Sequence, residues 1–172
     1  CGVLLGLFAG YLGGAVDLVI MRIIDFLLAF PGLVLALMVI AVLGPNLQNL
    51  MIAVGIRHIP SFARVVRGSV LSTKENLYVE AARAIGCSTP RVTFRHVFPN
   101  VLAPVIVLTS LDIGDAIIVG AGLSFIGMGA QPPTPEWGVM LSSGRAFIRS
   151  AWWLTVFPGL AIMISVLAVN LV

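Results

Sequence analysis

Long apolar segments are the feature of this sequence that most restricts its fold. Residues 24–43, 102–125 and 151–172 form three such segments, and a helix needs about 20 mainly apolar residues to cross the hydrocarbon core of a membrane. Residues 47–63 fit less well because Arg57, His58 and Pro60 interrupt them, and residues 1–12 are too short to span. We therefore expect an all-α integral membrane bundle truncated to about five transmembrane helices, at about residues 1–12, 24–43, 47–63, 102–125 and 151–172.

The overall composition supports one membrane domain over residues 1–172. Only 10% of the residues are charged and 59% are hydrophobic, with a mean hydropathy of +1.10, whereas a soluble domain carries about 25% charged residues. The excess apolar surface must be covered by lipid or by a large partner. Because the sequence has no initial methionine and starts and stops inside apolar runs, we expect it to be part of a longer protein.

The basic residues predict the orientation of the segments. Arg64, Arg67, Lys74 and further arginines lie between segments 47–63 and 102–125, whereas Arg145 and Arg149 precede the last segment. Loops rich in Lys and Arg remain in the cytoplasm. We therefore predict a cytoplasmic insert at residues 64–99 and an outer loop at residues 127–150.

The insert has the local chemistry of two short helices joined at a corner. Residues 75–85 are good helix formers without an interior glycine or proline, and Leu77, Ala81 and Ile85 recur at intervals of four as one apolar stripe. Gly86 is suited to end this helix. Small alanines beside the stripe would let another surface approach closely, so the insert is either a structured connection or a docking element.

A second short helix is predicted directly after the corner. The stretch Ser88-Thr89-Pro90 provides a hydroxyl cap followed by a proline at the first helical position, which together are a strong start signal. Pro99 is expected to end this helix and to open the next membrane segment.

Three stretches of the chain resemble a known family. Glu80-Ala81-Ala82, followed by Gly86 and Pro99, resembles the EAA signature of permease subunits in binding-protein-dependent ATP-binding-cassette (ABC) importers of the MetI-like type I class. Residues 96–99 depart from the usual Ile-x-Leu-Pro ending in the manner of the peptide and nickel branch. Residues 123–138 and 21–32 resemble the loop after the fifth span and the third span of the C-type dipeptide and oligopeptide permeases.

The resemblance implies the fold of a type I importer permease, lacking its first span and its cytoplasmic tail, and a set of partners. The insert would contain the coupling helix, which would sit in a groove of a cytoplasmic ATPase. The residues implied in this coupling are Glu80, Ala81, Ala82, Gly86 and Pro99. Two such ATPases would use ATP and Mg²⁺, a second and non-identical permease would complete the pore, and an extracytoplasmic binding protein would deliver the solute. The location implied is the inner membrane of a bacterial or archaeal cell.

The sequence argues against an enzyme. A P-loop requires lysine followed by serine or threonine, but the only lysine, Lys74, follows Thr73. His58 and His96 are expected at different depths, so no catalytic constellation is credible. We expect neither cofactor nor metal to be bound by this chain.

Ionisable residues inside membrane segments are costly and usually face a cavity or a partner. Counting about 1.5 Å per residue from each membrane surface places Arg57 and Asp112 at similar depth. Asp115 lies one helical turn further on, and His58 is adjacent to Arg57. We hypothesise that Arg57 meets Asp112 or Asp115, or lines the translocation path with them; mutual neutralisation within the bundle is the alternative.

The outer loop offers a candidate contact for the binding protein. It is rich in proline, and Glu136, Trp137 and Arg145 would form this contact, although tryptophans at this level also anchor a chain in the headgroup region. The rival function is an ion-coupled secondary transporter built around the intramembrane charges. The sequence does not identify the cargo, which could be a dipeptide, an oligopeptide, a nickel chelate or another small solute.

Overall fold

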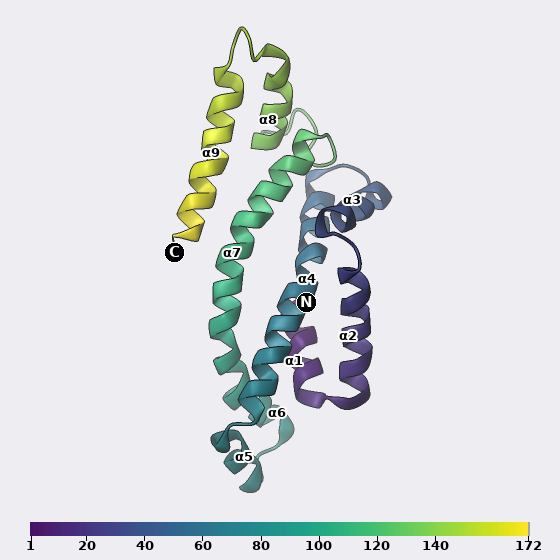
Figure 1. Cartoon of the computed structure of the whole chain (residues 1–172), viewed down its shortest axis with the longest axis vertical. Helices are drawn as coiled ribbons and strands as arrows, with labels where there is room; N and C mark the ends of the chain where they lie inside the picture. Colours follow the sequence, from purple (N-terminus) through teal and green to yellow (C-terminus); the bar gives the residue numbers. More distant parts are fainter. Residues whose placement is uncertain (172) are drawn as a thin grey trace. The chain divides into compact units, whose positions relative to one another are not determined.

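The computed structural model describes residues 1–171, and this part of the chain contains helices and no strands (Figure 1). The predicted all-helical class is confirmed. The helices, with one π-helical and one 3₁₀ turn, are α1 Gly2–Leu12, α2 Gly14–Leu28, α3 Gly32–Leu43, α4 Leu47–Lys74, α5 Leu77–Ala84, α6 Thr89–Val92, the π turn Thr93–Val97, α7 Phe98–Phe125, α8 Trp137–Gly144, the 3₁₀ turn Arg145–Phe147 and α9 Trp153–Asn170.

Within the described residues 1–171, two helices are long and apolar enough to cross a membrane. They are α9 and the continuous helix Thr89–Phe125, and α2 with α3 would form a third span if the bent pair is counted as one. The predicted segment 24–43 falls on this pair, which bends by 90° at its break. Pro31, at φ −54° and ψ 132°, precedes α3 in an extended conformation, and a proline has no N–H with which to continue the preceding helix. The remaining predicted spans stay predictions.

The described chain divides into two compact units. Unit 1 comprises residues Cys1–Ala29 and His58–Thr109, and unit 2 comprises Phe30–Arg57 and Ser110–Val172. The buried core of unit 1 draws on α1, α4, α5, α6, the π turn and α7, so the insert predicted at residues 64–99 is part of a packed unit. Its fully or nearly buried members are Leu7, Val66, Val70, Val79, Ala82, Val92, Val97 and Val101.

A glycine stripe brings α1 against α4 in unit 1. Gly2, Gly6 and Gly10 recur every fourth residue and are all buried. A Cβ at these positions would lie 2.6 Å from the Ile59 carbonyl oxygen, 2.4 Å from the Ala63 carbonyl oxygen and 2.8 Å from the Val70 Cβ, respectively. Small residues at this spacing let helix backbones approach closely inside a membrane.

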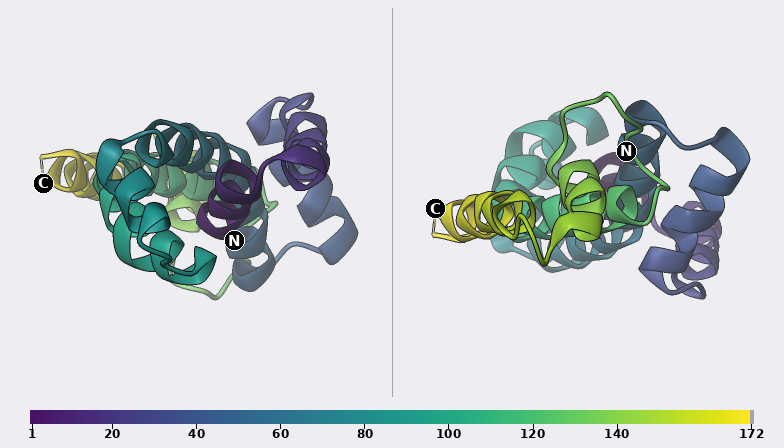
Figure 2. Two further views of the ribbon diagram at one scale, coloured as in Figure 1. Left: turned by 90° about the horizontal axis from the view of Figure 1, so that it is seen from below. Right: turned by 90° about the horizontal axis from the view of Figure 1, so that it is seen from above.

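In unit 2, glycines also allow close contact between helices around α8. A Cβ on Gly138 would lie 2.2 Å from the Ala121 carbonyl oxygen of α7, and one on Gly144 would lie 2.9 Å from the Leu154 carbonyl oxygen of α9. Helices α8 and α9 lie side by side (Figure 2, right). The buried core of this unit comprises Ala36, Ile40, Leu50, Ala53, Val54 and Leu123.

Candidate functional site

Helix α5 forms at the position predicted for the first helix of the insert. It covers Leu77–Ala84 and follows Asn76, whose extended backbone (φ −72°, ψ 140°) starts the helix without a side-chain cap. Val79 and Ala82 are buried in the core of unit 1. The helix is therefore fixed to the rest of the unit along one face.

The opposite face of α5 is exposed and apolar. Leu77 is 82% exposed and Ile85 is 81% exposed, and Ala81 between them is exposed as well. The predicted stripe of Leu77, Ala81 and Ile85 therefore points away from the core. Within the EAA signature, Ala82 holds the helix in the unit, whereas Glu80 and Ala81 lie on the outer surface.

Gly86 ends α5 in a Schellman motif, in agreement with the prediction from its sequence. Its φ of +84° lies in the left-handed region that favours glycine. The Gly86 N–H donates to the Arg83 carbonyl (2.9 Å), and the Cys87 N–H donates to the Ala82 carbonyl (3.1 Å). The corner is thus fixed by backbone geometry that a side chain at position 86 would strain.

The second helix of the insert differs from its prediction. Ser88 precedes α6, but its side chain makes no capping hydrogen bond. Pro90 is the second residue of α6, not the first as predicted. The expectation that Pro99 ends this helix is wrong, because α6 continues through the π turn into α7. The Phe98 N–H donates to the Thr93 carbonyl in the wider π pattern, and Pro99, which has no N–H to donate, follows directly where this turn interrupts the regular α-helical hydrogen bonds.

Two contacts join the insert region to the last turn of α1. The Arg83 guanidinium lies 5.4 Å from the centroid of the Tyr11 ring, and the Lys74 Nζ donates to the Gly10 carbonyl oxygen at 3.2 Å. An open cavity of about 420 Å³ lies beside them, lined by Tyr11, Lys74, Glu75, Glu80 and Arg83. No local sequence signal pointed to these contacts, because α1 and α5 are far apart along the chain.

Ion pairs hold α2 against α4 in unit 1. The Arg67 guanidinium donates to both carboxylate oxygens of Asp17 at 2.5 and 2.6 Å, and Arg64 donates to Asp25 at 2.7 Å. The two hydrogen bonds from Arg67 to Asp17 therefore tie α2 to α4 within unit 1.

The hypothesised charge contact is present in unit 2. Arg57 forms an ion pair with Asp115, and the second Arg57 nitrogen lies 3.4 Å from the other carboxylate oxygen. The Arg57 side chain is 22% exposed and that of Asp115 is 42% exposed. Gly32 makes room for the arginine, since a Cβ there would lie 2.6 Å from the Arg57 Nε.

The neighbouring pathway candidates are less distinctive. Asp112 lies one turn before Asp115 on α7 and is half-buried, and His58 is half-buried in unit 1. Their roles in a translocation path stay predictions.

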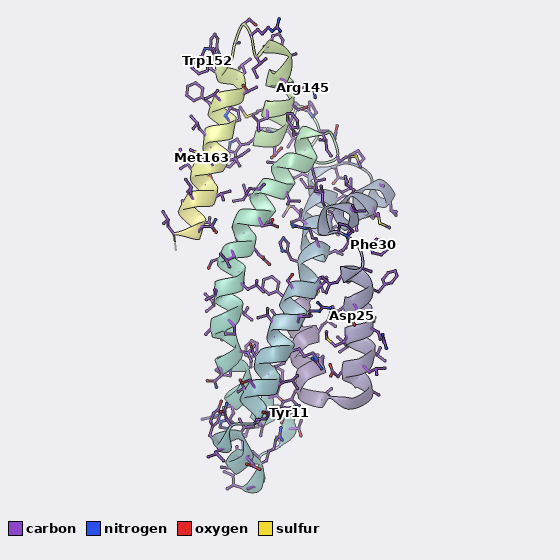
Figure 3. The ribbon with its side chains drawn as sticks, viewed as in Figure 1. Tyr11, Asp25, Phe30, Arg145, Trp152 and Met163 are labelled. Atoms are coloured by element: carbon purple, nitrogen blue, oxygen red, sulfur yellow. The ribbon has the colours of Figure 1, made fainter. Side chains whose placement is uncertain are left out.

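The three residues predicted to contact a binding protein, Glu136, Trp137 and Arg145, lie at or next to α8. Glu136 caps α8 by accepting a hydrogen bond from the Val139 N–H at 3.0 Å. Trp137, the first residue of α8, is 40% exposed. Arg145, the first residue of the 3₁₀ turn after α8, lies 5.8 Å from the centroid of the Phe125 ring, and Figure 3 shows it close to the connection that leads to Trp152.

Comparison with known proteins agrees with the sequence resemblance. The chain is 49% identical over 171 residues to the dipeptide transport system permease protein DppC of Alkalihalophilus pseudofirmus, and 48% identical over 170 residues to the glutathione transport system permease protein GsiD of Pectobacterium atrosepticum. It is also 46% identical to the di/tripeptide transport system permease protein DppC of Pseudomonas aeruginosa. Each alignment covers 99% of this chain and 56% of the relative, so the chain spans just over half of their length.

A family model covers nearly the whole chain. Residues 2–172 match the model of the binding-protein-dependent transport system inner membrane component. The relatives are described as transport permeases and not as enzymes. With its apolar helices, this chain is an integral membrane protein and belongs to the family of binding-protein-dependent transport system inner membrane components.

Proposed function

We propose that this chain is the core of a permease subunit in an ATP-driven importer of peptides or similar small solutes. The relatives are named for dipeptides, di- and tripeptides and glutathione, which supports a short-peptide cargo. The membrane would be the inner membrane of a bacterial cell. A second, non-identical permease would complete the pore, and an extracytoplasmic binding protein would deliver the cargo.

One observation carries the ATP-driven part of the proposal. Helix α5 is anchored in the core of unit 1 through Val79 and Ala82. Its exposed apolar residues Leu77, Ala81 and Ile85 lie on the face that points away from this core. A contiguous exposed apolar surface rimmed by charged residues is typical of a protein interaction site. We assign this face, with Glu80 and the Gly86 corner, to a groove of a cytoplasmic ATPase.

In this mechanism the chain supplies no nucleotide chemistry of its own. Two ATPase subunits would bind ATP and Mg²⁺, and their closure would displace α5. Because α5 belongs to the packed core of unit 1, its displacement would move that core as a body and change access to the transport path. Substrate released by the binding protein would then cross the membrane.

The Arg57–Asp115 pair is assigned to the transport path in this proposal. Two partly exposed charges inside a membrane protein can accept the charged ends of a passing peptide in place of each other. His58 and Asp112 are the further path candidates. A pure packing role predicts instead that an exchanged pair, Arg57→Asp with Asp115→Arg, restores both folding and wild-type substrate preference.

Contact with the binding protein is assigned to the outer surface around α8. Trp137 is exposed there, whereas Glu136 and Arg145 have structural contacts within unit 2. Exposed tryptophan and arginine are favoured in protein interfaces. We therefore expect Trp137 to contribute more to this contact than Glu136.

The proposal is tested with Glu80→Lys and Gly86→Asp in the complete importer. Lysine reverses a charge on the docking face, and aspartate places a Cβ at a φ of +84°. Both variants are expected to remain in the membrane and to lose ATP-dependent uptake. Arg22→Gln, at an exposed position on α2, serves as the control and should transport normally.

Two outcomes would contradict the proposal. Normal uptake in both variants would show that the corner and Glu80 are not needed for coupling. Uptake that persists without ATP hydrolysis and stops when the proton or sodium gradient is dissipated would favour the ion-coupled secondary transporter, for which the intramembrane charges would be the coupling site.

A further inference from the structure

Side chains from α4 and α5 contact the last turn of α1. Arg83 of α5 lies 5.4 Å from the centroid of the Tyr11 ring, which is within the range of a cation–π interaction. Lys74, the last residue of α4, donates to the Gly10 carbonyl oxygen at 3.2 Å. Figure 3 shows Tyr11 at the end of α1 that lies nearest to α5 and α6.

The two contacts have different physical roles. Lys74 places a cation at the C-terminal carbonyls of α1, where the helix dipole favours positive charge. It ties α1 to α4, which the glycine stripe also does. Arg83 is different, because it links α1 to the exposed helix α5 through side chains alone.

The core below the Arg83–Tyr11 contact connects the same helices. Val79 and Ala82 of α5 and Leu7 of α1 are buried in one cluster, and Tyr11 packs against its edge. Close-packed interiors transmit displacement because they contain little free volume. A force on the exposed face of α5 therefore reaches α1 both through this cluster and through Arg83.

We propose that Arg83 and Tyr11 are positioning residues for energy coupling, which fix α1 to α5 so that a displacement of α5 also moves α1. This inference rests on the proposed docking of an ATPase on α5. It adds a path by which the movement reaches α1, and through the turn at Gly13 and Gly14 also α2.

The surroundings of the contact make it testable without unfolding the protein. Tyr11 and Arg83 both line the open cavity of about 420 Å³, so shortening either side chain enlarges a space that is already open. Leu7, Val79 and Ala82 remain in place beneath it. Tyr11→Leu keeps an apolar side chain at the edge of the core but removes the aromatic ring, and Arg83→Gln removes the cation at an exposed position.

The experiment uses the complete importer reconstituted in liposomes with its ATPases and binding protein. The measurement is the number of labelled dipeptide molecules imported per ATP hydrolysed. Tyr11→Leu and Arg83→Gln are each expected to lower this ratio about two- to fivefold, the factor that corresponds to the loss of an exposed cation–π interaction. Tyr11→Phe retains the ring and should retain the ratio, and Arg22→Gln controls for the loss of one positive charge.

A double variant separates a shared role from two independent ones. If the two residues act through their mutual contact, Tyr11→Leu combined with Arg83→Gln lowers the ratio no further than either change alone. The proposal would be overturned if the double variant lowered the ratio by the product of the two single effects. It would also be overturned if the ratio stayed at the wild-type value while only the amount or the thermal stability of the protein fell. Should Tyr11→Leu fail to accumulate, the exposed Arg83→Gln with Arg83→Lys as its conservative partner decides the question by the same ratio.

The design distinguishes this inference from the proposed function. If the wild-type importer shows no ATP-driven uptake, the proposed function fails and the inference falls with it. If the wild type transports and both single variants couple normally, only the role of Arg83 and Tyr11 is refuted.

Discussion

Substitution of Gly6 by alanine tests how tightly α1 is held against α4. A Cβ at Gly6 would lie 2.4 Å from the Ala63 carbonyl oxygen and 2.8 Å from the Val66 Cβ. Ordinary van der Waals contact begins at 3.4 Å, so the helices would have to separate by about 1.0 Å (3.4 minus 2.4). Neither obstacle is a flexible side-chain end, and Leu7, the next residue, is fully buried in the unit 1 core.

The expected magnitude combines two opposing effects. Overpacking of a close-packed site destabilises by about 1–3 kcal/mol, and the backbone obstacle places Gly6→Ala near the upper limit. Alanine improves helix propensity over glycine by about 1 kcal/mol. The net loss is therefore about 2 kcal/mol, which corresponds to a fall in the midpoint of thermal unfolding of about 4–8 °C for a chain of this size.

Gly68 provides a matched control within the same unit. It lies in α4, and a Cβ there would meet nothing within 4 Å. Gly68→Ala should therefore leave stability unchanged or raise it by up to about 1 kcal/mol. For both variants, the full-length protein is purified in detergent and heated to a series of temperatures. The fraction that remains monodisperse at each temperature gives the midpoint of thermal unfolding. A Gly6→Ala midpoint equal to or above that of Gly68→Ala would refute the packing argument.

Three further predictions concern contacts that the structure defines. In a double-mutant cycle with Asp17→Asn and Arg67→Gln, the bidentate pair should show a coupling energy of about 1 kcal/mol, the upper limit for pairs near a surface; additive unfolding midpoints would contradict it. Glu136→Ala should destabilise α8 by about 1 kcal/mol through loss of its N-cap, whereas Glu136→Asp, which retains a capping carboxylate, should not; hydrogen exchange of the α8 amides measures both. Gly32→Ala should lower the thermal midpoint less than Gly6→Ala, because its obstacle is the flexible Arg57 side chain, and the loss should vanish in an Arg57→Ala background, which lacks the Cγ, Cδ and Nε atoms that the new Cβ would meet.

The residues of the insert alone are sufficient to predict helix α5 and the residue at which it ends. Good helix formers followed by a glycine predicted both the helix and the left-handed residue at Gly86, because these depend on the backbone preferences of a few consecutive residues. The same reasoning found the signals of Ser88 and Pro90 but overestimated them. A start signal shows where a helix can begin, and the continuation of α6 into α7 depends on the π turn, which no local preference indicated.

Orientation and long-range contacts were harder to predict. The stripe of Leu77, Ala81 and Ile85 was correctly grouped on one face, but periodicity does not say whether that face meets the core of its own chain or a partner. The glycines of α1 did carry a signal, since three of them recur at intervals of four. The spacing does not say which helix these glycines pack against, because that depends on which helices become neighbours. The same holds for the contact of Tyr11 with Arg83.

The Arg57–Asp115 pair is the instructive exception, since its residues are 58 positions apart and a contact of Arg57 with one of two aspartates was still anticipated. The membrane supplies an external scale, because each helical residue advances about 1.5 Å through a core about 30 Å thick. Two costly charges at similar depth then have a strong reason to meet. No such scale applies to the insert at residues 64–99, where position along the chain says little about position in space. The contacts of the insert with α1, such as that of Arg83 with Tyr11, are for this reason the ones that only the folded structure could identify.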